Sequence, residues 1–219
     1  MPATRWKNPY TALVKTKPQL LRPFCDNTVA DDDVDFVKSA LARFDTRFCE
    51  IGSGSGGHLI ELARKHPGTL CIGFELRFKR IYRTAQKAEE AELNNVLLLR
   101  TNGQLLEHFF PTRSLDAIIV NFPDPWAKKR WRKHRLLTPQ FLTTVSRLLR
   151  PGGSFSYKTD HCEYFEETAQ HIERCPELEL TYKTNDLNST PIAEHLIRSE
   201  FESLFISKGL PINYLEART

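Results

Sequence analysis

Two periods of apolar residues alternate along the chain and together predict its secondary structure. Short apolar runs predict strands at residues 47–51, 69–74, 96–99, 115–120, 154–158, 179–183 and 212–215. Apolar residues three or four positions apart predict helices at residues 31–43, 57–65, 77–93, 104–109, 138–149, 162–174 and around 201–205. Because strands alternate with helices, we expect an α/β fold with a mostly parallel seven-stranded sheet and helices on both of its faces.

The N-terminal segment lacks this alternation. Residues 1–30 contain four prolines and show no clear period, so we predict a poorly structured N-terminal arm. Its basic residues could contact RNA, although a loosely packed tail is the favoured interpretation. We expect residues 31–219 to form a single domain, which suits a chain of 219 residues.

The composition narrows the class of protein. With 40% hydrophobic and 26% charged residues, the chain is neither disordered nor collagen-like. No apolar stretch approaches membrane-spanning length and the N-terminus has no signal-peptide pattern, so we expect a cytoplasmic protein without a membrane partner. The five cysteines are widely spaced and lack the spacing of a zinc site, so we expect no bound metal.

Positive charge is concentrated in one segment, residues 128–135, which we call the basic run. The whole chain has a formal net charge of +4, whereas the basic run alone contains six lysines and arginines. A local basic patch is typical of nucleic-acid binding. A solvated charged surface is the alternative, but two prolines before the run fix it beside a candidate site. We predict phosphate contacts from Lys129, Arg130, Arg132, Lys133 and Arg135.

That candidate site is the loop after the predicted strand at residues 115–120. Pro123 and Pro125 flank Asp124, and Trp126 follows directly. Ligands of parallel α/β sheets bind outside the carboxyl ends of the strands, which is where this loop lies. The structural alternatives are a carboxylate that only accepts turn hydrogen bonds and a tryptophan that belongs to the core.

A glycine-rich segment, residues 50–57, joins the first long strand to its helix. Glycines there permit a tight turn and let a ligand approach the backbone closely. Gly52, Gly54 and Gly57 fit the dinucleotide-binding fingerprint, whereas Gly52, Gly54 and Gly56 fit the E-x-G-x-G-x-G pattern of methyltransferases that use S-adenosylmethionine. The glycines alone therefore leave both cofactor classes open.

Polar residues near the glycines favour the methyl donor. Glu50 precedes the glycines and can complement the ammonium group of a cationic cofactor. Glu75 ends the second long strand, where either cofactor needs a carboxylate for its ribose hydroxyls. Asn102 follows the third long strand, where it can contact adenine or simply complete a turn. No basic residue lies in the glycine loop to meet a pyrophosphate, although backbone N–H groups can do so.

These residues resemble one family, the bacterial tRNA (guanine-N7-)-methyltransferases, from about residue 47 onward. The markers are E-I-G-x-G-x-G at 50–56, G-F-E at 73–75, N-F-P-D-P-W-x-K-K-R at 121–130, K-T-D at 158–160 and S-E-F-E at 199–202. The D-P-W-x-K-K-R segment is the specific marker among them. The resemblance implies a Rossmann-like methyltransferase fold whose last strand is antiparallel. It also implies methyl transfer from S-adenosylmethionine to N7 of the variable-loop guanosine, position forty-six, of tRNA.

The resemblance assigns roles by position. Cofactor contacts would come from Glu50, Gly52, Gly54, Gly56, Glu75, Asn102 and Asp124, and Asp124 would also be the catalytic residue. Substrate contacts would come from Lys128, Asp160, Ser199, Glu200, Phe201 and Glu202. The family usually has Asp at the position of Asn102 and Thr at that of Ser199, and both replacements keep a hydrogen-bonding group. No obligatory protein partner is implied, and monomer and homodimer both stay open.

The chemistry of guanine also favours carboxylates over a nucleophilic His or Cys. N7 has a free lone pair and no proton, so its methylation needs no general base, and the product is a cation. Catalysis should then depend on positioning and electrostatics. Guanine donates hydrogen bonds only from its N1–H and 2-amino edge, which Asp124, Asp160 or Glu202 can bind; Ser199 or Lys128 can bind O6. The base must leave its stack, which favours a loop nucleotide.

Two other functions stay open from the sequence. An NAD-dependent dehydrogenase would use the same glycine loop, but no residue stands out as the acid or base for hydride transfer. Tight binding of NADH but not of S-adenosylhomocysteine would favour it. A non-catalytic tRNA-binding subunit would keep the fold without needing the carboxylates and glycines together, and it would bind cofactor without turnover.

Overall fold

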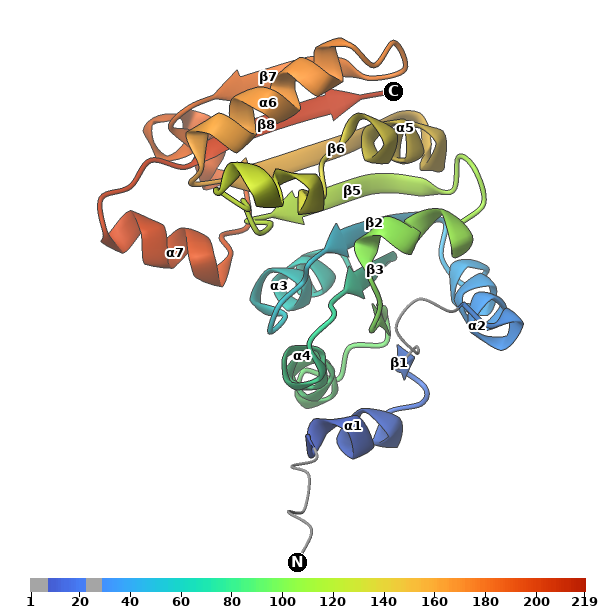
Figure 1. Ribbon diagram of the computed structural model, residues 1–219. Coiled ribbons are helices and arrows are strands. Elements are labelled where there is room, and N and C mark those ends of the chain that lie inside the picture. Colours follow the sequence, from blue (N-terminus) through green and yellow to red (C-terminus); the bar gives the residue numbers. More distant parts are fainter. Residues whose placement is uncertain (1–7, 23–28) are drawn as a thin grey trace, which may run out of the picture.

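The computed structural model describes residues 8–22 and 29–219, which are organised around one eight-stranded sheet (Figure 1). In chain order its strands are β1 (Leu21–Arg22), β2 (Thr46–Ile51), β3 (Thr69–Phe74), β4 (Val96–Leu99), β5 (Leu115–Asn121), β6 (Leu149–Thr159), β7 (Glu179–Thr184) and β8 (Asn213–Arg218). The spatial order is β1-β4-β3-β2-β5-β6-β8-β7. β8 runs antiparallel to both of its neighbours, and all other pairs are parallel. The predicted fold class and the antiparallel last strand are confirmed.

Helices cover both faces of this sheet because alternate residues of each buried strand point to opposite sides. In β5, Ile118 and Val120 belong to the cluster that contains α2 (Asp31–Leu41), α5 (Pro139–Leu148) and α6 (Cys162–Glu173). Ile119 packs against the cluster of α3 (Gly57–Lys65) and α4 (Phe78–Glu90) on the other face. The remaining helices are α1 (Tyr10–Leu13), α7 (Glu200–Ser207) and the 3₁₀ helices η1 (Val14–Thr16), η2 (Gly103–His108), η3 (Lys129–His134), η4 (Leu187–Ser189) and η5 (Pro191–Glu194).

Local sequence signals explain where several helices begin. α5 begins at Pro139 after Thr138, whose hydroxyl accepts a hydrogen bond from the Phe141 N–H at 3.2 Å. α7 begins after Ser199 with a capping box, in which Ser199 and Glu202 each accept a hydrogen bond from the other's backbone N–H. These caps fix the ends of two helices that flank the carboxyl edge of the sheet.

The N-terminal segment is more structured than predicted. Residues 8–22 form α1, η1 and β1, and β1 adds a strand beside β4, so the sheet has one strand more than the seven expected. Val14 and Leu21 are fully buried, which ties this segment to the edge of the sheet. A two-residue strand and a four-residue helix are too short to show a period, which is why the pattern missed them. The rest of the predicted arm, residues 1–7 and 23–28, lies outside the described residues.

Two further differences concern single elements. β6 begins at Leu149 instead of residue 154, and the segment expected as a helix at 104–109 is the 3₁₀ helix η2. Within the described part of the chain, no helix is both long enough and apolar enough to cross a membrane.

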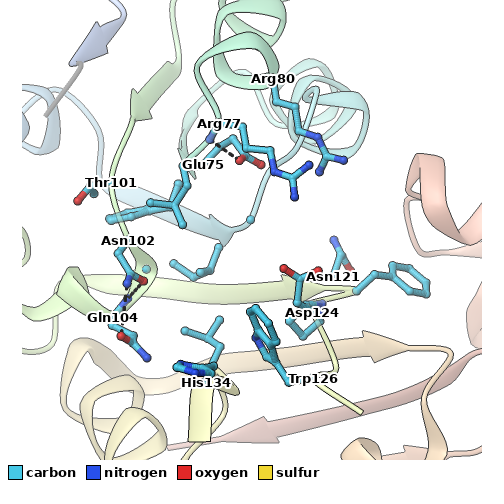
Figure 2. Close-up of a pocket in the computed structure, with 18 of the residues that line it drawn as sticks. Glu75, Arg77, Arg80, Thr101, Asn102, Gln104, Asn121, Asp124, Trp126 and His134 are labelled. Carbon is cyan, nitrogen blue, oxygen red and sulfur yellow. Dashed lines mark hydrogen bonds between the residues drawn. The ribbon is translucent and has the colours of Figure 1, made fainter. Parts of the chain in front are cut away.

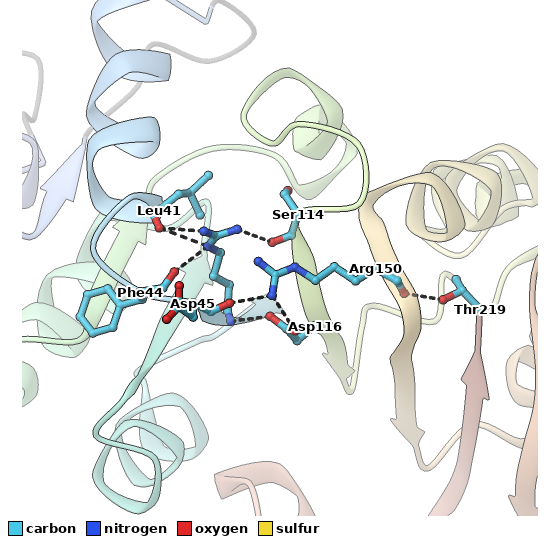
Figure 3. Close-up of polar contacts among 8 residues, drawn as sticks. Leu41, Phe44, Asp45, Ser114, Asp116, Arg150 and Thr219 are labelled. Carbon is cyan, nitrogen blue, oxygen red and sulfur yellow. Dashed lines mark hydrogen bonds and ion pairs between the residues drawn. The ribbon is translucent and has the colours of Figure 1, made fainter.

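Charged side chains at the amino ends of the strands bind one another and the backbone (Figure 3). The guanidinium group of Arg47 donates to three carbonyl oxygens within 3.2 Å, those of Leu41, Phe44 and Ser114. Asp116 accepts from the Arg47 N–H at 2.8 Å and from Arg150 at 3.1 Å. We call Arg47, Asp116 and Arg150 the amino-edge network, and each of its charges has a partner.

Candidate active site

Two adjoining pockets lie at the opposite edge, where the parallel strands end. The larger has a volume of about 540 Å³ and is lined from the ends of β2, β3 and β5 and the segment after β4 (Figure 2). The smaller, about 80 Å³, follows the glycine loop. The two pockets share Gly52, Arg80, Asn121 and Phe201. They lie at the edge where the sequence predicts a ligand site.

The glycine loop wraps the smaller pocket in backbone conformations that suit glycine. Gly52, Gly54 and Gly56 have φ values of +81°, +59° and +82°. A Cβ on Gly56 would lie 2.5 Å from the side chain of Thr84 in α4, so a larger residue would push the loop off the helix. The Thr84 hydroxyl donates to the Gly54 carbonyl at 3.2 Å. The loop is therefore fixed against α4 with its backbone open to the pocket.

Glu50 is a buried carboxylate with one oxygen paired and one unpaired. It is 2% exposed, its Oε1 accepts from Asn121 at 3.0 Å, and the same atom lies 3.2 Å from His58 Nδ1. Oε2 is buried without a hydrogen-bond partner among the described residues. Burial alone would raise the pKa of Glu50, but His58, Asn121 and the charge of Lys158 outweigh burial and lower its pKa. An ionised, half-satisfied carboxylate next to the glycine loop is suited to a cationic ligand.

Glu75 lines the larger pocket and retains capacity to accept hydrogen bonds. Its two oxygens accept from the N–H groups of Gly54 at 3.1 Å and Arg77 at 2.7 Å. Burial raises the pKa of Glu75, although these hydrogen bonds and the charge of Arg80 oppose the increase. Since each carboxylate oxygen has a second lone pair, Glu75 can still bind hydroxyl groups in the pocket.

Asn102 combines the two roles that the sequence left open. Its side-chain oxygen accepts from the Gln104 N–H at 3.0 Å and so caps η2. The residue also lines the larger pocket. The turn function is present in the structure, and the adenine contact stays a prediction.

Asp124 stands in a strained loop. Phe122 and Trp126 have φ values of +49° and +44°, a conformation that non-glycine residues rarely adopt outside constrained sites. Pro123 and Pro125 stiffen the segment between them. Asp124 is exposed, lines the larger pocket, and forms no hydrogen bond or ion pair with any described residue. The loop thus presents an unpaired carboxylate to the pocket.

Trp126 belongs to the rim of the pocket and not to the core. It is 37% exposed and lines the larger pocket. Its ring centroid lies 5.3 Å from that of His134 and 6.3 Å from that of Trp131. Lys128 and Arg130 each lie 4.9 Å from the Trp131 ring. Lys128 and Arg130 therefore pack against this aromatic rim while they stay exposed.

The side chains of the five predicted phosphate contacts are exposed, half-buried or, for Arg135 alone among the five, buried. Lys129, Arg130 and Lys133 are exposed and make no ion pair with a described acidic residue. Arg132 is half-buried and pairs with Glu163 at 2.5 Å. The structure therefore leaves three of the five free to meet a polyanion.

Arg135 requires a correction, because it is buried and cannot act as a surface phosphate contact. It is 2% exposed, donates to the Pro125 carbonyl at 2.8 Å and pairs with Glu167. Its guanidinium lies 4.6 Å from the Tyr164 ring. Arg135 instead anchors the Asp124 loop to α6.

The predicted substrate residues of the S-E-F-E segment also differ in environment. Phe201 is 41% exposed and lines both pockets, and Glu200 lines the smaller pocket while pairing with Lys87 at 3.0 Å. Ser199 lines the smaller pocket and caps α7. Glu202 faces inward: it is 2% exposed and pairs with Lys158 at 2.8 Å. A substrate contact from Glu202 would require this ion pair to open.

The other two predicted substrate residues lie outside both pockets. Lys128 is exposed over Trp131, and Asp160 is exposed just before α6. The cap of α6 is His161, whose Nδ1 accepts from the Tyr164 N–H at 3.2 Å, so Asp160 does not have the capping role considered as its alternative.

Comparison with known proteins identifies the family of this chain. Residues 45–215 match a family described as "Putative methyltransferase". A tRNA (guanine-N(7)-)-methyltransferase from Listeria innocua serovar 6a is 38% identical over 169 residues, which cover 77% of this chain and 78% of that protein. The chain belongs to the tRNA (guanine-N7-)-methyltransferase family. A bifunctional glycosyltransferase/methyltransferase from Fusobacterium nucleatum is 34% identical over 194 residues, 88% of this chain, but the chain spans only 30% of that longer protein.

Solved structures support the fold. The 16S rRNA methyltransferase KamB superposes with a TM-score of 0.63 at 17% identity, covering 88% of this chain and 94% of that one. At this identity the likeness bears on the fold alone, and it agrees with the methyltransferase family membership.

The family motifs do not include every residue that shapes the pockets. His58, Arg80 and His134 line them without having been predicted. Asn121 and Lys158 lie in the marker segments but were not predicted to contact Glu50 or Glu202. The available signal was a polar residue at or near the end of an otherwise apolar strand. Among the described residues, no group of three or more His, Cys, Asp or Glu side chains could hold a metal ion.

Proposed function

We propose that this protein is an S-adenosylmethionine-dependent enzyme that methylates N7 of the variable-loop guanosine, position forty-six, of tRNA. Family membership supports the reaction, since relatives at 37% and 38% identity are named tRNA (guanine-N(7)-)-methyltransferases. The exposed cations of the basic run support an RNA substrate. We also propose that the chain acts without an obligatory protein partner.

The observation that carries the cofactor assignment is the unpaired Oε2 of Glu50. It is buried beside the glycine loop, where a carboxylate left without a partner is costly unless a ligand completes it. The ammonium group of a methionine moiety fits this need in charge and in hydrogen-bonding capacity. When bound, S-adenosylmethionine would supply an electrophilic methyl group on its sulfonium centre.

The larger pocket suits the nucleoside part of the same cofactor. Glu75 can accept hydrogen bonds from ribose hydroxyls, and Asn102 lies where the polar edge of an adenine would come. Because the pockets share Gly52 and Asn121, one extended molecule can occupy both.

Asp124 is the residue best placed to act on the substrate. Its unpaired carboxylate can accept hydrogen bonds from the N1–H and 2-amino groups of guanine and thereby orient the base. The same negative charge stabilises the purine cation that forms when N7 is methylated, without moving any proton. Trp126 at the rim and Phe201 on α7 can stack on a base or exclude water.

The decisive experiment is transfer of labelled methyl groups to unmodified tRNA transcripts, with nucleoside analysis of the product. Wild type should form N7-methylguanosine, and Asp124→Ala should lose roughly 100-fold or more in kcat while still binding S-adenosylhomocysteine. Methylation at another atom would overturn the proposed substrate position. Cofactor binding without any transfer would indicate a non-catalytic subunit.

A further inference from the structure

The first turns of α4 carry a second group of cations that the proposed function does not yet use. Arg77, Lys79, Arg80 and Arg83 lie within seven residues, and no acidic residue interrupts them. Arg77, Lys79 and Arg83 are exposed, and Arg80 is half-buried. None of the four forms an ion pair with a described acidic residue, whereas Lys87 farther along the helix pairs with Glu200. We call these four residues the α4 basic patch.

Helix stability does not explain this placement. The amino end of a helix carries partial positive charge, so cations there are unfavourable and acidic residues are preferred. The first turn of α4 contains no acidic residue, and Arg77 stands at its N-cap. By contrast, α2 begins with Asp31, Asp32 and Asp33, the arrangement that the dipole favours. Arg77, Lys79 and Arg80 thus oppose the local electrostatics of their own helix, whereas Arg83 lies beyond the first turn.

The α4 basic patch borders the same pocket as the basic run, from the other side. Arg77 and Arg80 line the larger pocket together with Lys133 and His134. Figure 2 shows the two arginines across the pocket from His134, with Asp124 and Trp126 on the His134 side. Two surfaces with exposed cations that form no ion pair with a described acidic residue therefore flank the larger pocket, where a guanine would enter.

We propose that the α4 basic patch is a second RNA-binding surface, which holds backbone phosphates on the side of the target nucleotide opposite to the basic run. This inference rests on the proposed function. A nucleotide that enters a pocket has a phosphodiester on each side, and the two flanking segments of chain leave the pocket in different directions. The basic run can hold the phosphates of one segment, and the α4 basic patch holds those of the other.

Lys79 and Arg83 provide the cleanest test because neither lines a pocket. The double variant Lys79→Ala/Arg83→Ala should lower the slope of log Kd against log salt for unmodified tRNA by about 1.5, which is a loss of roughly 30-fold in affinity at 0.1 M salt. Binding of S-adenosylhomocysteine should be unchanged. The matched control Lys65→Ala/Arg174→Ala removes one lysine and one arginine from the carboxyl ends of α3 and α6 and should keep the wild-type slope, since both side chains are exposed and form no ion pair with a described acidic residue.

A structural role for these cations makes a different prediction. The double variant Lys79→Ala/Arg83→Ala should have a melting temperature equal to or above that of wild type, since Lys79 opposes the helix dipole and exposed Arg83 forms no ion pair with a described acidic residue. The charge-conserving variant Lys79→Arg/Arg83→Lys should retain the wild-type slope. A lower melting temperature with an unchanged slope would overturn the proposal in favour of a structural role.

The outcomes also separate this inference from the proposed function. If wild type methylates guanosine N7 in tRNA but the Lys79→Ala/Arg83→Ala slope equals that of wild type, only the α4 surface is overturned. If wild type binds no tRNA at any salt concentration, both are overturned. A reduced slope in this variant, beside normal methyl transfer by wild type, supports both.

Discussion

The two edges of the parallel sheet carry charged residues in opposite states. At the amino edge, Arg47, Asp116 and Arg150 bind one another and the backbone, so the charges of the amino-edge network are satisfied by the chain itself (Figure 3). At the carboxyl edge, Glu50 Oε2 is buried without a partner, and Asp124 has none among the described residues. Carboxylate oxygens that have no partner among the described residues thus lie at the carboxyl edge, next to paired charges such as those of Lys158 and Glu202.

This difference offers a physical test of which charges are functional. A buried polar group with a purely structural role is expected to find its hydrogen-bond partner within the chain, as almost all buried polar groups do. A buried charged group left unpaired, such as Glu50 Oε2, has a desolvation cost that a bound ligand can offset. Substitutions should therefore affect stability at paired charges and affinity at unpaired ones.

The largest expected effect comes from a paired charge at the carboxyl edge. Lys158 donates to Glu202 at 2.8 Å and to the Ile197 carbonyl at 3.1 Å, and both charged side chains are at most 5% exposed. Lys158→Met leaves the buried Glu202 carboxylate without a cationic partner, which should lower the free energy of unfolding by about 3–5 kcal/mol. Denaturant unfolding measures this loss, and Lys158→Met/Glu202→Leu should recover much of it. A loss well under 1 kcal/mol would show that pairing does not mark structural charges here.

A smaller loss of stability is expected at the amino edge. Arg47→Ala removes the donor to three backbone carbonyls, so the free energy of unfolding should fall by about 2–3 kcal/mol. The affinity for S-adenosylhomocysteine should not change, because the network lies at the far end of the strands. Calorimetric binding to the folded variant provides the check, and weakened binding would contradict the separation of the two edges.

Glu50→Gln tests the unpaired side of the comparison. The variant keeps the size of the side chain but removes the negative charge beside the glycine loop. The affinity for S-adenosylhomocysteine should fall by about 2 kcal/mol, a factor of roughly 30, because a charged hydrogen bond is lost. The loss of stability should be smaller than for Lys158→Met. Unchanged affinity combined with a large loss of stability would make Glu50 a structural residue.

The sequence predicted the long elements of the fold because their apolar periods are decisive over six or more residues. The strands at β2 and β3 and the helices α3 and α6 have this property. β1 could not be predicted, since two residues show no period and their burial depends on pairing with β4.

The candidate site was predictable in position but not in the state of each charge. The glycine loop, Glu75 and Asp124 follow strands directly, so topology alone brings them to one edge. Arg135 has the same chemistry as its neighbours in the basic run, yet it is buried by contacts with Glu167, 32 residues away. Lys158 likewise depends on Glu202, 44 residues away. Such long-range pairing leaves no local pattern.

The smallest expected effect is a pH dependence that follows from Glu50. Its pKa in the folded state is lowered, because His58, Asn121 and Lys158 outweigh the effect of burial. The ionised carboxylate therefore adds stability that is fully present above the unfolded pKa of about 4.3 and is lost as the pH falls through the folded pKa. The difference in unfolding free energy between wild type and Glu50→Gln should decrease as the pH falls below about 4.3.

Glu75 provides a control of opposite sign. Burial raises its pKa, so ionising Glu75 costs stability as the pH rises from the unfolded pKa through the folded one. The difference between wild type and Glu75→Gln should therefore decrease with rising pH, whereas that for Glu50→Gln increases. If both differences moved in the same direction, the Glu50 carboxylate would not be held ionised by its neighbours. The carboxyl group of Glu50 would then become ionised only when the cationic cofactor binds beside it.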